Sequence, residues 1–352
     1  MTKNNVANYP VVIHLVPYDG IGGVETAARS MADFKQDGTN FQVNYIFSAL
    51  SVSRHRFPLF NPFPYFDVAR RIIAARPDIL IVSLWRSCAV AFLVKLIFPR
   101  IRVVLFLHST EDVHFPDRLL TRLTAMISHQ IWADSKATLV RRLPDCRLTK
   151  NGKVISFVIH HIFAPEKRLV EAVFIFWGRI HALKRLERAL AIFANIHAVH
   201  PEARFIIIGP DGGELARLQK LILSMGLTHA VRFAGEMNFS EIKCLAKDAS
   251  FYLQTSELEG MAMSVVEGMQ LGLVPVVTPV GEISSYCRHQ KNSLLITSDR
   301  GVAEDILALL NDPQKYEQVR NRAIATWVAK PLYAESVVNA CLEIYSEIND
   351  EG

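Results

Sequence analysis

The chain has 352 residues, of which 50% are hydrophobic and 21% charged, so it is a globular protein long enough for two domains. Its charge is uneven: residues 1–165 carry 20 Lys and Arg against 11 Asp and Glu, whereas residues 166–352 carry 19 against 23. No arginine-rich arm or helix-turn-helix pattern accompanies the basic half, which argues against a nucleic-acid partner. An anionic membrane surface or an acidic acceptor is the better match for that half.

The sequence carries no pattern of export or of a membrane span. Its N-terminal residues are polar, and the apolar run after them is broken by His14 and Pro17. The most apolar region, residues 88–108, contains Lys95, Arg100 and Arg102 and is predicted to be a helix, a turn and a strand. The five cysteines are odd in number, scattered and mostly in apolar settings, with no CxxC or metal-ligand spacing, which is typical of a reducing compartment. We therefore expect a cytoplasmic protein.

The first part of the chain alternates apolar strands with helices. Strands are predicted at residues 11–16, 41–47, 79–83, 103–108, 131–133 and 154–159. A helix after the first strand is predicted to end near residue 34, and further helices are predicted at residues 68–75, 90–98 and 118–128. Residues 51–66 are predicted to form a loop. This alternation predicts a parallel, doubly wound sheet.

A polar connection at residues 160–168 leads to a second run of the same kind. Its strands are predicted at residues 173–177, 205–209, 231–234, 251–254 and 274–278, with a short strand at 294–297 before three final helices. The predicted fold class is therefore α/β, with two Rossmann-like, doubly wound domains facing a cleft. We expect one domain at residues 1–162, a second at 163–331 and a terminal helical segment at 332–352.

Two glutamates with seven residues between them, Glu259 and Glu267, follow the strand at 251–254. A helix is predicted at 264–271, so Glu259 lies in the loop before it and Glu267 in its early turns. The backbone N–H groups between the two acids would surround the helix start and bind an anion. These groups belong to Gly260, Met261, Ala262 and Met263. Carboxylates beside an anion site suit a ligand with both phosphates and hydroxyl groups, such as a sugar diphosphate.

Cationic and glycine residues follow other predicted strands. After the strand at 173–177, Arg179 can bind a diphosphate bidentately and Lys184 can bind it as a point charge. Gly209 ends the next strand. In the first domain, Gly22 and Gly23 belong to a turn in which glycine lets the backbone approach a phosphate.

The first turn does not have the spacing of a dinucleotide-binding fingerprint. The third glycine of that pattern would fall at position 25, which is Glu25, and no acidic residue closes the second strand. This argues against a dehydrogenase.

His108 ends the strand at 103–108, and the carboxyl end of a parallel strand faces the ligand crevice of an open sheet.

The acidic stretch resembles a motif of retaining glycosyltransferases of family 4, which have the GT-B fold. The family pattern is Glu-Gly-Phe-Gly, an apolar helix start and Glu-Ala. Here it stands as residues 259–262 and Glu267-Gly268, so that Ala262 replaces a glycine. In the family the first Glu contacts hydroxyls of the donor sugar and the second holds the nucleotide ribose, which implies these roles for Glu259 and Glu267. The resemblance covers most of the chain and is strongest from residue 173 to residue 281.

The cationic stretch is similar to the family's Gly-Arg followed by Lys-Gly, with Arg185 in place of the second glycine. The resemblance implies that Arg179 and Lys184 stabilise the leaving diphosphate without a metal. It also implies that the Gly209 turn lies near the nucleotide, and that His108 lies near the transferred sugar and the acceptor. The final helix is expected to cross back to the first domain.

The resemblance implies a retaining hexosyltransferase that uses a nucleoside diphosphate sugar as donor and needs no cofactor. The acceptor would be a hydroxyl of a glycan, a lipid-linked glycan or a lipopolysaccharide-type molecule. A nucleotide-sugar epimerase on the same fold and a non-catalytic sugar-nucleotide binder are alternatives. A glycoside hydrolase with Glu259 and Glu267 as acid and nucleophile is another, although Arg179 and Lys184 favour a phosphate ligand.

We also expect peripheral contact between the basic first domain and the anionic inner face of the cytoplasmic membrane. The basic residues expected to make it are Arg118, Arg122, Arg141, Arg142, Arg147, Lys150 and Lys153.

Overall fold

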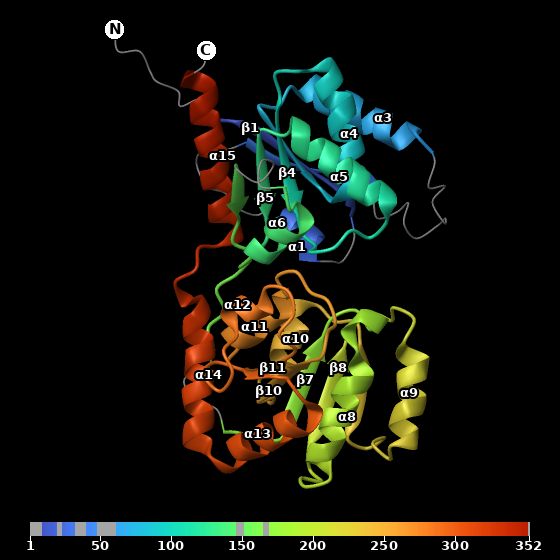
Figure 1. Ribbon diagram of the computed structural model, residues 1–352, viewed down its shortest axis with the longest axis vertical. Helices are drawn as coiled ribbons and strands as arrows, with labels where there is room; N and C mark the ends of the chain where they lie inside the picture. Colours follow the sequence, from blue (N-terminus) through green and yellow to red (C-terminus); the bar gives the residue numbers. More distant parts are fainter. Residues whose placement is uncertain are drawn as a thin grey trace. The chain divides into compact units, whose positions relative to one another are not determined.

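The structure, a computed structural model, describes residues 9–19, 23–31, 40–47, 61–145, 151–164 and 169–350. The chain forms two compact units, one of residues 1–159 with 331–352 and the other of residues 160–330. Each unit is built on a six-stranded parallel sheet with helices on both faces, which confirms the predicted α/β class (Figure 1).

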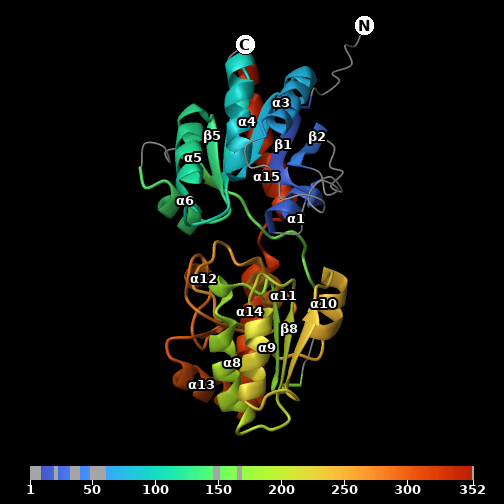
Figure 2. The same ribbon diagram turned by 90° about the vertical axis from the view of Figure 1, so that its right-hand side faces the viewer.

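The first unit has the strand order β2-β1-β3-β4-β5-β6. Its strands are β1 Val11–Tyr18, β2 Asn40–Phe47, β3 Ile79–Ser83, β4 Arg102–Leu107, β5 Gln130–Ala133 and β6 Gly152–Val154. Its helices are α1 Gly23–Ser30, α3 Phe63–Ala75, α4 Leu84–Ile97, α5 Phe115–Ile127, α6 Lys136–Arg142 and α15 Tyr333–Asp350. Helices α3, α4 and α5 lie side by side on one face of the sheet and α15 lies on the other (Figure 2).

The two faces of this sheet follow the alternation of side chains along its strands. Leu80 and Val82 of β3 belong to the apolar core shared with α3, α4 and α5. Phe106 of β4 points to the opposite face, where its ring stacks on Tyr333 of α15. Two polar residues, His14 and Ser83, are buried on that second face.

Several predicted boundaries in the first unit are wrong. Helix α3 begins at Phe63, inside the predicted loop, because Pro64 in its first turn has a backbone angle suited to a helix start. Helix α4 begins at Leu84 rather than near residue 90, and α6 was not predicted. Strand β6 ends at Val154, and the chain beyond it leaves the sheet to accept a hydrogen bond at Val158 O from Tyr333 N, 2.7 Å away.

The second unit has the strand order β12-β11-β10-β7-β8-β9. Its strands are β7 Val173–Trp177, β8 Arg204–Ile208, β9 Val231–Gly235, β10 Phe251–Gln254, β11 Val274–Val277 and β12 Leu294–Leu295. Its helices are α8 Leu186–His197, α9 Leu215–Ser224, α10 Phe239–Ala246, α11 Met263–Gln270, α12 Ile283–Tyr286, α13 Asp299–Asn311 and α14 Pro313–Val328, with a 3₁₀ turn η1 at Ala182–Lys184. Strands β10, β7 and β8 are neighbours, so the loops after their carboxyl ends meet at one edge.

Candidate functional site

The loops after β7 and β10 are joined by an ion pair between two predicted site residues. Lys184 Nζ lies 2.6 Å from Glu259 Oε1. The backbones of the same loops are also tied together, because Glu257 N donates to Leu183 O over 2.9 Å. Thr255 Oγ1 lies 2.7 Å from Arg185 O and donates to it. The fold therefore places the cation and the carboxylate together although 75 positions separate them in sequence.

Gln254, at the end of β10, orients the Glu259 carboxylate through a hydrogen bond. Its Nε2 donates to Glu259 Oε1 over 2.8 Å, and its Oε1 accepts a hydrogen bond from Tyr252 Oη, also over 2.8 Å. Both Gln254 and Tyr252 are buried. We did not predict these two residues; the signal in the sequence was a polar side chain ending an otherwise apolar strand beside the acidic motif.

Glu267 lies in α11 and accepts a hydrogen bond from Trp177 Nε1 over 2.8 Å. Burial raises the pKa of its carboxyl group to about 7, and the hydrogen bond from Trp177 opposes that rise. Because the ordinary pKa is near 4.5, this acid changes charge close to neutral pH. Trp177 is a further residue that the sequence reasoning missed.

Helix α11 begins in an unusual conformation at one of the two positions where the chain departs from the family's glycines. Ala262 precedes the helix with φ 56° and ψ 65°, in the left-handed region. Arg185, the other departure, has φ 48° and ψ 42° between η1 and α8. Both positions where the family pattern has glycine are thus left-handed in this chain, although each carries a side chain.

We expect Ala262→Gly to stabilise the protein by about 1 kcal/mol, because the left-handed conformation strains any residue with a Cβ. The measurement is the free energy of unfolding in urea. Ala189→Gly, within α8, is the matched control and should destabilise by about 1 kcal/mol because glycine is unfavourable inside a helix. Equal losses for both variants would contradict the assignment of strain to Ala262.

Arg179 follows β7 and remains exposed, with no ion pair or hydrogen bond recorded to any described residue. The surrounding backbone is fixed, since Ile180 N donates to Pro210 O over 2.9 Å and Gly212 N donates to Ile180 O over 2.8 Å. Gly209 has φ 141°, and a Cβ there would collide with the carbonyl of Gly178. The loops after β7 and β8 therefore approach each other through glycine backbones beside Arg179.

The segment between Glu259 and α11 is held from the side by residues after β11. Tyr286 Oη donates to Met261 O over 2.9 Å, and Glu282 N donates to Gly260 O over 3.1 Å. A Cβ on Gly281 would collide with the carbonyl of Glu259. The backbone of the predicted anion site is consequently rigid, with Met263 as the first residue of α11.

Among the first-unit candidates, His108 directly follows β4 and Gly23 begins α1, while Gly22 lies outside the described residues. His108, which is half-buried, is linked to the buried Ser83 and His14 in a chain of three side chains that sequence reasoning missed. Ser83 Oγ lies 2.8 Å from His14 Nε2 and 2.8 Å from His108 Nε2. One hydroxyl proton can serve only one ring, so the other ring must donate, and the two histidines hold opposite tautomers.

Both rings of this chain are neutral at pH 7. Burial lowers the pKa of His14 to about 3, and burial together with the charge of His14 lowers the pKa of His108 well below its ordinary value. Neither Nδ1 atom has a hydrogen-bond partner among the described residues.

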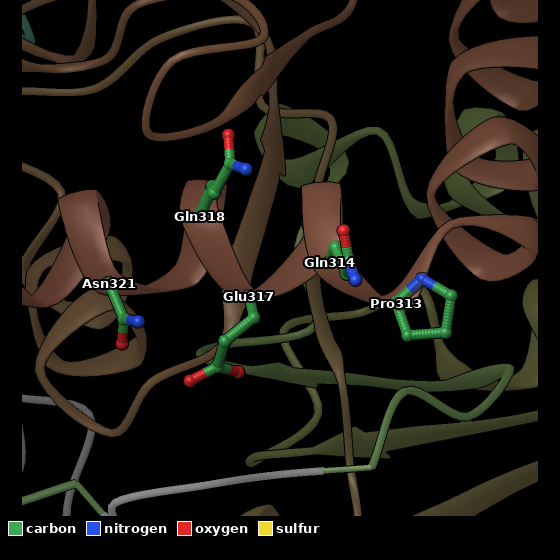
Figure 3. Close-up of a pocket in the computed structure, with 5 residues that line it drawn as sticks. All are labelled: Pro313, Gln314, Glu317, Gln318 and Asn321. Carbon is green, nitrogen blue, oxygen red and sulfur yellow. The ribbon is translucent and has the colours of Figure 1, made fainter.

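A recess of about 430 Å³ lies elsewhere in the second unit, along the first turns of α14 (Figure 3). It is lined by Pro313, Gln314, Glu317, Gln318 and Asn321. Tyr316, on the same turns, donates from Oη to Ser250 O, 3.1 Å away, and Ser250 directly precedes β10. The recess is therefore at the edge where strands begin, opposite the edge that carries Glu259 and Glu267, and we do not assign the ligand to it.

Within the described ranges, no three His, Cys, Asp or Glu side chains are grouped so that they could hold a metal ion. None of the described helices is both long and apolar enough to cross a membrane.

Residues 160–326 match the family model described as "Glycosyl transferases group 1". The chain is 24% identical over 174 residues to the uncharacterized glycosyltransferase YqgM of Bacillus subtilis, covering 49% of this chain and 48% of that protein. It is also 24% identical over 156 residues to GDP-mannose:cellobiosyl-diphosphopolyprenol alpha-mannosyltransferase of Komagataeibacter xylinus. That match covers 43% of this chain and 40% of that protein. The matches therefore span less than half the length of these curated relatives.

Among solved structures, Anabaena HepE in complex with UDP-glucose is similar with a TM-score of 0.75 at 17% sequence identity. The similarity covers 97% of this chain and 100% of that chain, so it extends over both units.

Proposed function

The chain belongs to the group 1 glycosyltransferases through residues 160–326 and has the GT-B fold, and on that premise we propose that it transfers a hexosyl unit from a nucleoside diphosphate sugar to a hydroxyl group, with retention of configuration. The observation that supports this most is the pairing of Lys184 with Glu259 at the edge where β7 and β10 end. A phosphate ligand suits the cation, and sugar hydroxyls suit the acid.

In this proposal Arg179 and Lys184 bind the diphosphate and stabilise the negative charge that develops on it as the sugar leaves. The exposed Arg179 is ready to bind, whereas Lys184 must exchange Glu259 for phosphate. The released Glu259 then accepts hydrogen bonds from sugar hydroxyls. The acceptor hydroxyl attacks on the face from which the diphosphate departs, and the diphosphate takes its proton.

Nucleotide binding is assigned to α11 and the turns beside it. Glu267 would accept hydrogen bonds from the ribose, the N–H groups from Gly260 to Met263 would contact phosphate, and the Gly209 turn would lie near the nucleotide. HepE holds UDP-glucose and the K. xylinus relative is named for GDP-mannose. UDP- and GDP-sugars are accordingly the first donors to test, without added metal.

We assign Gly22, Gly23 and His108 of the first unit to the donor phosphate and acceptor side. Ser83 and His14 are positioning residues in this assignment, since they fix the ring and tautomer of His108. The proposed acceptor is a glycan carried on a lipid, the class that the name of the K. xylinus relative describes.

The test is a panel of nucleotide sugars with and without lipid-linked acceptors. Release of the nucleoside diphosphate only when acceptor is present supports transfer. A changed sugar on an intact nucleotide, without acceptor, would instead identify an epimerase. Binding without either reaction would identify a sugar-nucleotide binder.

The two acids are expected to separate nucleotide binding from sugar transfer. Glu267→Gln should weaken nucleoside diphosphate binding by about 1.5–3 kcal/mol, the range for a hydrogen bond to a charged group, whereas Glu259→Gln should mainly lower the transfer rate. Titration calorimetry with UDP or GDP measures the first effect and initial rates the second. Weak binding of sugar-free nucleotide in Glu259→Gln, with normal binding in Glu267→Gln, would reverse the two roles.

Nucleotide affinity is also expected to rise with pH. Glu267 must lose its proton to accept ribose hydrogen bonds, and its pKa is about 7. Affinity should therefore increase about tenfold between pH 6 and pH 8, as the ionised fraction does. Glu267→Gln should remove this dependence, and a slope that persists in that variant would assign it to another group.

A further inference from the structure

Helix α5 exposes four large apolar side chains and buries three polar ones, Asp117, Thr121 and Thr124. Phe115 is 74% exposed, Leu119 45%, Leu123 40% and Met126 70%. Their spacing of three or four residues puts them on one face of the helix, which we call the α5 outer face. A surface helix of a globular protein ordinarily has the reverse arrangement.

The buried face of α5 is accounted for by an internal charge pair. Arg142, from α6, pairs with Asp117, and its Nη2 lies 3.3 Å from Thr121 Oγ1. Arg142 also lies 3.0 Å from Asp112 Oδ1, and its side chain is 7% exposed. The expectation that Arg142 contributes to a basic surface is therefore wrong, because its side chain is buried and pairs with acidic residues. These contacts explain the polar inner face but not the apolar outer one.

The α5 outer face is edged with positive charge. Arg118 and Arg122 each follow an apolar member of the face by three residues and line the same side of it. The acidic residue within α5, Asp117, is buried. Arg118 has one weak ion pair, 3.9 Å from Asp112. Exposed apolar side chains with cations beside them complement a surface that combines hydrocarbon with negative charge.

We propose that the α5 outer face lies on an anionic lipid bilayer, with its apolar side chains entering the headgroup boundary and Arg118 and Arg122 contacting lipid phosphates. Pairing this face with itself in a second copy would bring the arginines of both copies toward one another, whereas an anionic bilayer complements them, which favours lipid as the occupant. The reason for such contact rests on the proposed lipid-linked acceptor, but the contact itself can be measured without any reaction.

The test is co-sedimentation with vesicles of phosphatidylcholine alone and of equal parts phosphatidylcholine and phosphatidylglycerol. The wild-type chain should bind the mixed vesicles, and added salt should weaken that binding. Leu119→Gln with Met126→Gln should reduce it about tenfold or more, because apolar insertion provides part of the affinity. Leu223→Gln on α9, where Leu223 is 71% exposed against 70% for Met126, is the matched control and should bind like the wild type.

Several results would overturn the proposal. Equal binding of wild type and the α5 double variant would do so, as would equal recovery with neutral and anionic vesicles. Sedimentation velocity without lipid is the further check: a dimer that the double variant abolishes, in a chain that does not bind vesicles, would identify a second copy as the occupant. Calorimetry with UDP or GDP on the same variants keeps a failure of the proposed donor site distinguishable from a failure of the membrane contact.

Discussion

Lys184→Ala is expected to lower turnover about a hundredfold to a thousandfold, the loss seen when one group that stabilises transition-state charge is removed. The lysine is the cation that pairs with Glu259, its Nζ lying 2.6 Å from the carboxylate oxygen Oε1. Initial rates with the best donor and acceptor from the panel measure the effect. Binding of the free nucleoside diphosphate should weaken in the same variant.

Two comparisons make the Lys184 result specific. Lys184→Arg retains the charge and should keep more activity than the alanine variant. Lys243→Ala, on the exposed side of α10, removes a cation of the same unit and should be neutral. Near-normal turnover in a folded Lys184→Ala protein would remove Lys184 from the mechanism.

Gly209→Ala is expected to have the largest effect on stability, about 4 kcal/mol or more, or to prevent folding of the second unit. The new Cβ would meet the carbonyl of Gly178, which is backbone and cannot rotate away, and φ 141° is unfavourable for alanine. Urea unfolding measures the loss. Gly213→Ala is the matched control, because Gly213 has φ 103° but open space around it, so it should show the strain without the collision. A Gly209→Ala protein no less stable than Gly213→Ala would contradict the collision.

The strands of the second unit were predictable because β7 is a short, continuous apolar run and β10 is one up to its last residue, Gln254. The start of α4 was not predictable, because that helix is mostly apolar and its few polar residues, among them Arg86 and Lys95, do not mark out one face. The short α6 was missed because Ser135, which accepts a hydrogen bond from Thr138 N over 3.1 Å, is a weak signal for a helix of a single turn or two.

The candidate site was predictable in its charged residues but not in what orients them. Motif spacing identified Lys184, Glu259 and Glu267. Trp177 contacts Glu267 from a separate strand 90 positions away, and a linear spacing cannot report such a pairing. Gln254 lies only 5 positions from Glu259, but the motif does not show that its side-chain amide donates to that carboxylate. The left-handed backbone of Ala262 was not predicted, because alanine, unlike glycine, does not indicate a positive φ in a sequence.

The pairing of Lys184 with Glu259 also bears on how the site releases its product. The Glu259 side chain is 10% exposed, so a ligand that draws Lys184 away leaves a largely buried carboxylate without its cation. A sugar diphosphate compensates with hydroxyl groups, whereas the nucleoside diphosphate left after transfer has no sugar to offer. Re-formation of the ion pair between Lys184 and Glu259 then competes with binding of the nucleoside diphosphate product. Glu259 thus competes with the product for Lys184, and this competition weakens retention of the nucleoside diphosphate after transfer more than it weakens binding of the donor before transfer.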